Sequence, residues 1–399
     1  MRKIAVITVG RSDYSIYKPL IDRITQDPEL ELFLIATGSH LSHEFGMTIH
    51  QIEADGFSVD AKVDMLISSD NPSAISKSIG IGTIGFAQLY SDTTDIDLII
   101  VLGDRFEMLS AVVAALPFNI PICHIHGGES TTGLIDEAIR HSITKMSHLH
   151  FTSTEAYSNR VIQMGEEPWR VITTGAPSLD NLNSLTLYEH DQLSKLVGMD
   201  TKDPFLLVTF HPVTLAYKDT EEHISELLSA LEESNQNIIF TYPNADTASR
   251  SIVHAIESYT RDHANSKCVI NLGLKNYFSL MTYSLAMVGN SSSGIIEAAS
   301  FQLPVVNVGE RQSGRIHGDN VIDTLCSKSE IVNAIQKATS PTFIETIKGM
   351  KNPYGNGTAS ETIVSCLKSV SYTHLRAHET DSYLVWRLGD EKKKGGGGG

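Results

Sequence analysis

The chain has 399 residues, of which 41% are hydrophobic and 20% are charged, a balance typical of a globular protein long enough for two domains. Its formal net charge is −16, with 31 basic and 47 acidic residues, which argues against nucleic-acid and membrane-surface binding, because both need a broad positive face. Four isolated cysteines fit neither a zinc pattern nor a disulfide framework, and no apolar run reaches the roughly 20 residues of a membrane span, so we expect a cytoplasmic protein.

Short apolar runs that favour β-strands alternate with amphipathic helical stretches along the chain. We predict strands at 3–8, 31–36, 98–102, 120–124, 150–152 and 170–173, and a second set at 205–210, 237–241, 268–270, 285–289 and 304–307. The helices predicted between them include 16–25, 111–116, 136–146, 156–164, 223–233, 252–259 and 294–301. Near-continuous apolar strands alternating with helices indicate parallel sheets covered by helices, and therefore an α/β fold.

The pattern breaks between the two sets of strands, where prolines and a polar Asn/Ser stretch follow residue 175. We therefore predict two Rossmann-like domains, 1–175 and 200–340, with an interdomain cleft, and a helix within 341–370 that returns to the first domain. Residues 371–399 show no sustained period and end in a run of glycines, and they resemble translated sequencing-adapter sequence. We predict a non-native or disordered tail there.

Polar motifs follow the predicted strands, and ligands of such folds bind at the carboxyl ends of strands. After the first strand, Gly10 permits a tight turn and Arg11 would act as a phosphate clamp, although a capped helix with a solvated arginine is the alternative. After the strand at 98–102, Asp104 stands beside Arg105. A carboxylate at a strand end suits a general acid or base, while helix capping by Asp104 is the simpler interpretation.

The densest group of carboxylates follows the strand at 120–124. Glu129, Asp136 and Glu137 should lie near the strand end that neighbours Asp104. Carboxylates that share a pocket push their pKa values apart, which separates an acid from a base. Capping carboxylates are the alternative interpretation.

The same segment is rich in histidine. His124 and His126, on one strand face, could ligate a metal together with Asp104 and His141. Buried histidines with hydrogen-bond partners would explain the same residues without a metal.

The second domain offers a predicted phosphate site. The turn after the strand at 285–289 carries Ser291, Ser292 and Ser293, and a helix follows. Free amides, hydroxyls and a helix dipole favour an anion there, and a single helix cap would need only one hydroxyl. Glu297, one turn later, could accept from both ribose hydroxyls. His211, at the end of the strand at 205–210, could donate to a phosphate or move a proton, although a lone histidine is more often structural.

A Gly/Ser loop follows the last strong strand of the second set. It contains Arg311 and Arg315, and two arginines at a strand end suit contact with a diphosphate. A solvated loop is the alternative.

Together these motifs resemble the UDP-N-acetylglucosamine 2-epimerase family, specifically its hydrolysing branch, which makes N-acetylmannosamine for sialic acid synthesis. The matching runs are GRSDY at 10–14, GDRFE at 103–107, HIHGGE at 124–129, IDEAIRHSITKMSHLHF at 135–151, HPVT at 211–214, GNSSSGIIEA at 289–298 and NPYGNGTAS at 352–360. The resemblance implies a GT-B-like pair of Rossmann-like domains that binds a nucleotide sugar between them. It also implies a homodimer or homotetramer and no metal or other cofactor.

The family reaction begins with anti elimination of UDP across C1–C2, and water then adds to the 2-acetamidoglucal. The resemblance implies that the catalytic residues are Asp104, Glu129, Asp136 and His211, with His126 and Glu137 as further candidates. It implies UDP binding by Arg11, Arg105, Ser291, Ser292, Ser293, Glu297 and Arg311. Some relatives carry glutamate at the position of His126, and in this chain the role of that glutamate falls to Glu129 or to His126 itself.

Four alternatives remain open from the sequence. The substrate could be UDP-N,N′-diacetylbacillosamine, because the residues that read the sugar C4 and C6 substituents are not identified. The chain could be a glycosyltransferase of the same fold, although that reaction needs no cluster of three carboxylates. The third alternative is a nucleotide-sugar sensor or a non-hydrolysing epimerase, and the fourth is a metal-dependent hydrolase.

Overall fold

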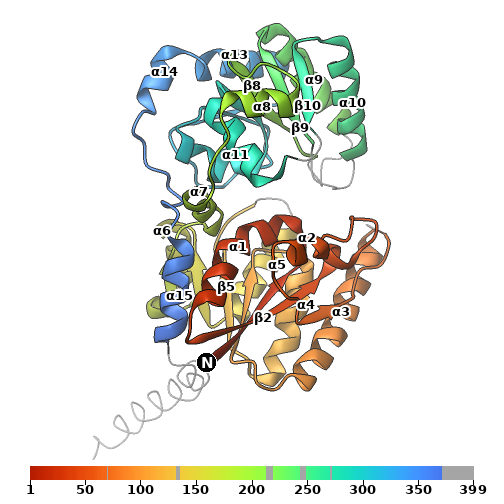
Figure 1. Cartoon of the computed structure of the whole chain (residues 1–399), viewed down its shortest axis with the longest axis vertical. Helices are drawn as coiled ribbons and strands as arrows, with labels where there is room; N and C mark the ends of the chain where they lie inside the picture. Colours follow the sequence, from red (N-terminus) through yellow and green to blue (C-terminus); the bar gives the residue numbers. More distant parts are fainter. Residues whose placement is uncertain (70, 132–134, 213–218, 243–248, 270–271, 371–399) are drawn as a thin grey trace, which may run out of the picture.

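The structure is a computed structural model, and it describes residues 1–69, 71–131, 135–212, 219–242, 249–269 and 272–370. The chain forms two α/β bodies stacked along its long axis (Figure 1). The predicted tail at 371–399 lies outside the described residues. No helix in the described part of the chain is long and apolar enough to cross a membrane.

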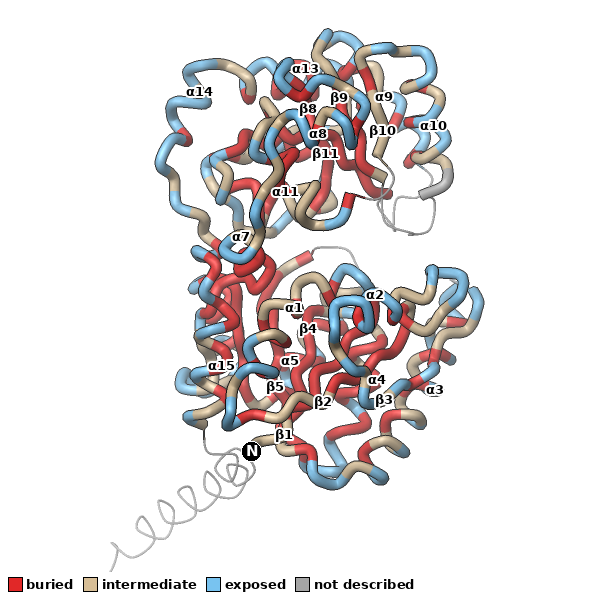
Figure 2. The backbone as a smooth tube through the Cα atoms, viewed as in Figure 1, coloured by how far each residue is buried: buried red, intermediate tan, exposed pale blue. Residues whose placement is uncertain are grey.

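The first body contains a sheet of seven parallel strands in the order β3-β2-β1-β4-β5-β6-β7. Its strands are β1 (Arg2–Thr8), β2 (Leu30–Thr37), β3 (Ala61–Val63), β4 (Leu98–Leu102), β5 (Ile122–Ile125), β6 (Leu149–Thr152) and β7 (Val171–Thr173). Its helices are α1 (Arg11–Gln26), α2 (Ile49–Ala54), α3 (Pro72–Asp92), α4 (Phe106–Ala115), α5 (Ile135–Met146) and α6 (Glu155–Gln163). Every residue of β4 and β5 is buried, because helices cover both faces of a parallel sheet (Figure 2).

The second body contains six parallel strands in the order β10-β9-β8-β11-β12-β13. Its strands are β8 (Phe205–Thr209), β9 (Asn237–Thr241), β10 (Ser266–Val269), β11 (Ala286–Gly289), β12 (Val305–Val308) and β13 (Val321–Thr324). Its helices are α8 (His190–Val197), α9 (Thr220–Ser234), α10 (Ser249–Asp262), α11 (Gly273–Tyr283), α12 (Ser292–Ile296), α13 (Lys328–Ala338) and α14 (Pro341–Thr346). Two parallel sheets, each covered by helices, confirm the predicted fold class.

Two segments connect the bodies. The first contains the short helices η4 (Pro177–Leu179) and α7 (Asp180–Ser184), and the second leads into the last helix, α15 (Ala359–Ser369). The carboxylate of Asp180 accepts hydrogen bonds from the backbone N–H groups of Ala359 (3.0 Å) and Ser360 (2.6 Å), and so caps α15. Ile363 and Leu367 of α15 are fully buried in the core of the first body, where the helix packs against α1 (Figure 1).

The predicted helix at 294–301 is wrong in its bounds. The helix α12 begins at Ser292 and ends at Ile296, and the 3-10 helix η6 (Ala298–Phe301) follows it. With five residues of α-helix, the dipole contributes less to anion binding than an eight-residue helix would, because fewer peptide units are aligned. The hydroxyls and free amides of the turn must therefore carry most of any phosphate contact.

Candidate functional site

Parallel pairing of β4 with β5 brings Asp104 close to the loop that follows β5, because Leu102 lies opposite Ile125. Arg140 of α5 joins the two segments. Its guanidinium forms an ion pair with Asp104 and donates to the carbonyl oxygen of Glu129 (2.9 Å) and to the hydroxyl of Thr131 (3.1 Å). The Arg140 side chain is 1% exposed. It was not singled out from the sequence, although its place one helical turn after Asp136 on α5 was a usable signal.

His126 and Glu129 form a buried pair in the same loop. The Nδ1 atom of His126 lies 2.6 Å from Oε1 of Glu129, which also accepts from the hydroxyl of Ser153 (2.9 Å). The backbone of His126 has φ +65°, a left-handed conformation that is uncommon for a residue other than glycine. Such strain persists only where the surrounding structure imposes it, and it is concentrated at functional sites.

Glu129 is ionised because positive charges surround it. Burial alone would raise the pKa of this carboxyl group, but the charges of His126 and Arg315 and the hydrogen bond from His126 hold the pKa well below its usual range. The guanidinium of Arg315 lies 3.5 Å from Oε2 of Glu129, and the Glu129 side chain is 3% exposed. Arg315 comes from the second body, and the sequence suggested a diphosphate contact for it.

Asp136, at the start of α5, shows the opposite behaviour. Burial, together with the negative charge of Asp104, raises the pKa of Asp136 to about 6, although the nearby Arg105 and Arg140 partly oppose this. The two carboxyl groups of this cluster therefore differ in basicity: the pKa of Glu129 lies well below its usual range, whereas Asp136 is ionised at neutral pH and takes up a proton near pH 6. Carboxyl groups whose pKa values are pushed apart can divide the roles of acid and base between them, and this division stays a prediction for Glu129 and Asp136.

The other candidates of the first body have defined partners. Arg105 precedes α4 and pairs with the fully buried Glu107 through Nε–Oε2 (3.2 Å) and Nη2–Oε1 (3.0 Å). Glu137 accepts from the backbone N–H of Thr131 (2.8 Å), a contact that anchors the loop. Arg11 is exposed and begins α1 directly after the turn that follows β1.

The suggested metal ligands are not brought together. His124 uses both ring nitrogens for hydrogen bonds, with the Thr144 hydroxyl (3.1 Å) and the Gly103 carbonyl (2.8 Å). Burial lowers the pKa of His124 to about 3, so this imidazole is neutral. In the part of the chain that the structure describes, no three His, Cys, Asp or Glu side chains are arranged to hold a metal ion.

In the second body, Asn290 links the end of β8 to the turn at residues 290–293, which we call the serine turn. Its side chain accepts from the backbone N–H of His211 (2.7 Å) and donates to the His211 carbonyl (2.8 Å). Glycine is required just before it, because Gly289 has φ +137° and an added Cβ would lie 1.9 Å from the Thr209 carbonyl oxygen. The turn therefore lies directly against the end of β8.

Arg311 supports the same turn from the other side. Its Nη1 donates to the Asn290 carbonyl (2.9 Å), which also accepts from the side chain of Gln312 (2.9 Å). Burial, assisted by the charge of Arg311, lowers the pKa of His211 to about 3, so this histidine is neutral. The hydroxyl of Ser291 caps α12 by accepting from the N–H of Ser293 (3.3 Å). Ser292 is the first residue of that helix.

Glu297 connects the two bodies. Its Oε1 accepts a hydrogen bond from the hydroxyl of Ser178 (2.6 Å), in the first connecting segment. Burial raises the pKa of Glu297 to about 7, while the Ser178 hydrogen bond and the charge of His126 partly lower it. The serine turn and the cluster around His126 are therefore close enough to interact electrostatically.

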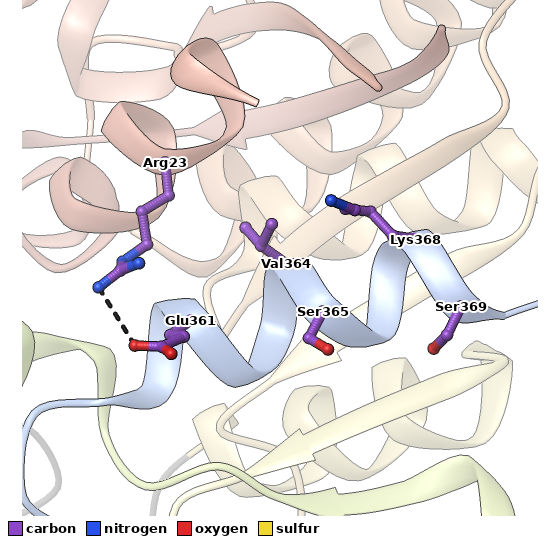
Figure 3. Close-up of a pocket in the computed structure, with 6 residues that line it drawn as sticks. All are labelled: Arg23, Glu361, Val364, Ser365, Lys368 and Ser369. Carbon is purple, nitrogen blue, oxygen red and sulfur yellow. Dashed lines mark ion pairs between the residues drawn. The ribbon is translucent and has the colours of Figure 1, made fainter. Parts of the chain in front are cut away.

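Two hollows of the surface lie away from these residues. One, of about 420 Å³, lies beside α15 and α1, where Arg23 and Glu361 form an ion pair at 3.5 Å (Figure 3). The other, of about 530 Å³, lies between α9 and α10. None of the candidate site residues lines either of these two hollows.

Comparisons with known proteins identify the family of the chain. A family model described as UDP-N-acetylglucosamine 2-epimerase matches residues 22–368. The chain is 39% identical to the polysialic acid biosynthesis protein P7 of Escherichia coli, with 89% of this chain and 90% of that protein covered. It is 38% identical to the GDP/UDP-N,N′-diacetylbacillosamine 2-epimerase (hydrolyzing) of Campylobacter jejuni, with 93% and 96% covered.

A solved structure shows the same fold. The crystal structure of UDP-GlcNAc 2-epimerase from Neisseria meningitidis bound to UDP-GlcNAc matches with a TM-score of 0.79 and 20% identity, covering 93% of this chain and 100% of that one. The family match covers most of the chain, and each of the two sequence relatives is identical to this chain at more than a third of the aligned residues. The chain therefore belongs to the UDP-N-acetylglucosamine 2-epimerase family.

Proposed function

We propose that the chain is a hydrolysing UDP-sugar 2-epimerase that converts UDP-N-acetylglucosamine and water to N-acetylmannosamine and UDP. The observation that carries the proposal is the cluster of carboxyl groups at the ends of β4 and β5, in which the buried Glu129 is held ionised and the partly buried Asp136 has a pKa of about 6. Inversion at C2 by elimination and addition needs such a pair, because a proton must leave C2 and later return to it.

In the first half of the reaction the C1–O bond breaks, UDP leaves with the bonding electrons, and a carboxylate takes the C2 proton. Asp136 suits this proton transfer, because a base with a pKa of about 6 is ionised at neutral pH and can still be reprotonated. Glu129 remains ionised and would stabilise the positive charge that develops on the sugar ring. Asp104 is oriented by its ion pair with Arg140.

In the second half, water adds across the double bond of the 2-acetamidoglucal, with its hydroxyl at C1 and a proton at C2. This proton arrives on the face of C2 opposite to the one that the first proton left. The free sugar that results is inverted at C2. His126 is suited to supply or accept a proton in this step, because it is hydrogen-bonded to Glu129 and lies in the same buried pair.

The diphosphate would be bound by the second body. The serine turn presents hydroxyls and helix N-terminal amides, and Arg311 and His211 flank it. Glu297 would bind the ribose hydroxyls after exchanging its hydrogen bond with Ser178. Arg11 and Arg105 would add positive charge from the first body.

The proposal is tested by incubating the purified chain with UDP-N-acetylglucosamine in D₂O and following the products by NMR. We expect UDP and free N-acetylmannosamine that carries deuterium at C2. A product that stays linked to the nucleotide would indicate a non-hydrolysing epimerase. Sugar transfer only in the presence of an acceptor would indicate a glycosyltransferase, and an unchanged substrate would refute enzymatic turnover.

UDP-N,N′-diacetylbacillosamine is the second candidate substrate. It is supported by the 38% identity to the Campylobacter jejuni enzyme, whose name specifies this sugar. Measuring kcat/KM for both UDP-sugars, and for the GDP-linked diacetylbacillosamine, would decide between them. A preference of more than about tenfold, which corresponds to roughly 1.4 kcal/mol of transition-state binding, would assign the substrate.

We also propose that the chain forms a homodimer through the outer face of α3 and α4. Ile84 is 74% exposed, and Ile81, Val113, Leu116 and Phe118 are also exposed large apolar residues of these helices and the turn after them. The two helices run side by side at the edge of the first body (Figure 1). Exposed apolar residues grouped on one face are typical of an interface.

A further inference from the structure

The loop that follows β12 connects the two halves of the site. Near its start, Arg311 donates to the Asn290 carbonyl of the serine turn. A few residues later, Arg315 reaches into the first body and lies 3.5 Å from the carboxylate of Glu129. One short segment therefore contacts both the proposed diphosphate site and the proposed proton-transfer site.

The far end of this loop is fixed by two buried tyrosines. The backbone N–H of Ile316 donates to the hydroxyl of Tyr157 (2.9 Å), and the hydroxyl of Tyr354 donates to the Ile316 carbonyl (2.7 Å). The two hydroxyls lie 3.3 Å apart. Because Ile316 is held on both sides of its peptide backbone, the neighbouring Arg315 has little freedom to leave Glu129.

The Arg315 side chain is itself desolvated. It is 13% exposed, and its Nε is buried without a hydrogen-bond partner among the described residues. A buried guanidinium is costly unless it faces negative charge, and Glu129 supplies that charge. Glu129 also interacts electrostatically with His126 and Arg140, and with the tyrosines Tyr157 and Tyr354.

We propose that Arg315 is a positioning residue, which holds the Glu129 carboxylate of the first body ionised and aligned with His126, so that the acid–base site is complete only when the loop of the second body is docked. This deepens the proposed function and rests on it for its catalytic part. Arg315 acts through Glu129 and not on the diphosphate, which distinguishes it from Arg311 on the same loop.

The direct test measures Glu129 itself and needs no substrate. In protein labelled with ¹³C at the glutamate carboxyl, the Glu129 resonance is assigned by its absence from Glu129→Gln and followed against pH. An opposite charge at this distance lowers a carboxyl pKa by about 1 to 3 units, so we expect Arg315→Met to raise the pKa of Glu129 by at least about one unit. Arg315→Lys, which keeps the charge, should restore most of the difference.

The kinetic test separates positioning from nucleotide binding. Arg315→Met should lower kcat by about 10- to 100-fold with a smaller change in KM, as loss of a supporting partner does elsewhere. Arg311→Met is the matched control from the same loop, and we expect it to raise KM more than it lowers kcat. Circular dichroism and thermal unfolding identify a misfolded Met variant, in which case Arg315→Gln replaces it.

The outcomes are distinguishable. An unchanged Glu129 titration in a folded Arg315→Met protein overturns the inference, whether or not the chain is an epimerase. If Arg315→Met raises KM as Arg311→Met does, and leaves kcat unchanged, Arg315 binds the nucleotide and the inference is again wrong. If the wild type converts no nucleotide sugar while the titration shifts as expected, the proposed function fails and the electrostatic role of Arg315 stands.

Discussion

Replacement of Arg140 by methionine tests the centre of the cluster most directly. The change removes the ion pair to Asp104 and the two hydrogen bonds to Glu129 and Thr131, while the apolar stem of the side chain is retained. Breaking a buried pair from one side costs about 3 to 5 kcal/mol, because the remaining charge is left without a partner. The Asp104 side chain is 26% exposed and can recover some hydration, so we expect a loss near the lower value, about 3 kcal/mol.

The assay is thermal unfolding at pH 7.5 followed by circular dichroism. For a body of this size about 1 kcal/mol shifts the midpoint by roughly 2 to 4 °C, so the expected loss is about 6 to 12 °C. The control is the double variant Asp104→Asn/Arg140→Met, which removes the orphaned charge as well. Its loss of unfolding free energy should be smaller than the sum of the losses measured for the two single variants. A midpoint for Arg140→Met within about 2 °C of the wild type would refute the role of Arg140 as the residue that joins the two segments.

Three further predictions follow from the same site and surface. The kcat/KM of the wild type should fall below about pH 6, because Asp136 is protonated there. Asp104→Asn removes the negative charge that adds to the effect of burial on the pKa of Asp136, so the residual activity of this variant should fall at a lower pH. A pH profile whose acid limb does not move would contradict the electrostatic coupling of Asp104 to Asp136. Glu297 has a pKa raised to about 7 from 4.5, so its contribution to stability is present below about pH 4.5 and is lost as the pH rises through 7. Glu297→Gln should therefore show a flatter dependence of the unfolding midpoint on pH across this window, and a dependence as steep as that of the wild type would count against the assignment. Ile84→Glu should convert a dimer to a monomer in analytical ultracentrifugation, with Ile344→Glu, an exposed residue of α14, as the matched control; dimers that persist in Ile84→Glu would exclude the α3–α4 face.

The central strands were predictable because they are apolar along their whole length, whereas two edge strands were missed. The strand β3 has three residues and β13 includes Asp323, so neither shows a continuous apolar run. The helix α3 was also missed, because it contains three glycines, which disfavour helices. One of them, Gly82, has a structural reason: an added Cβ would lie 3.0 Å or less from side-chain atoms of Met65 and Ser110.

The sequence indicated which strand ends contribute residues to the candidate site, but it did not indicate which side chains contact one another there. The order of strands places Asp104 beside the loop that contains Glu129, and alternating strands and helices indicate that much. The partners Arg140 and Arg315 depend on which way a helix face or a loop turns in three dimensions. The ion pair between Arg315 and Glu129 joins segments far apart in the chain, and no local pattern predicts it.

The docking of α15 has a consequence for synthesis on the ribosome. Ile363 and Leu367 fill the core beside α1, yet they leave the ribosome after every strand of both sheets. Until the second body has been translated, the first body therefore lacks α15, and an apolar groove along α1 stays uncovered. A chain that stops near residue 340 would keep both sheets and still expose that groove, so a nonsense mutation there should yield a protein that aggregates or is degraded, not a shorter enzyme.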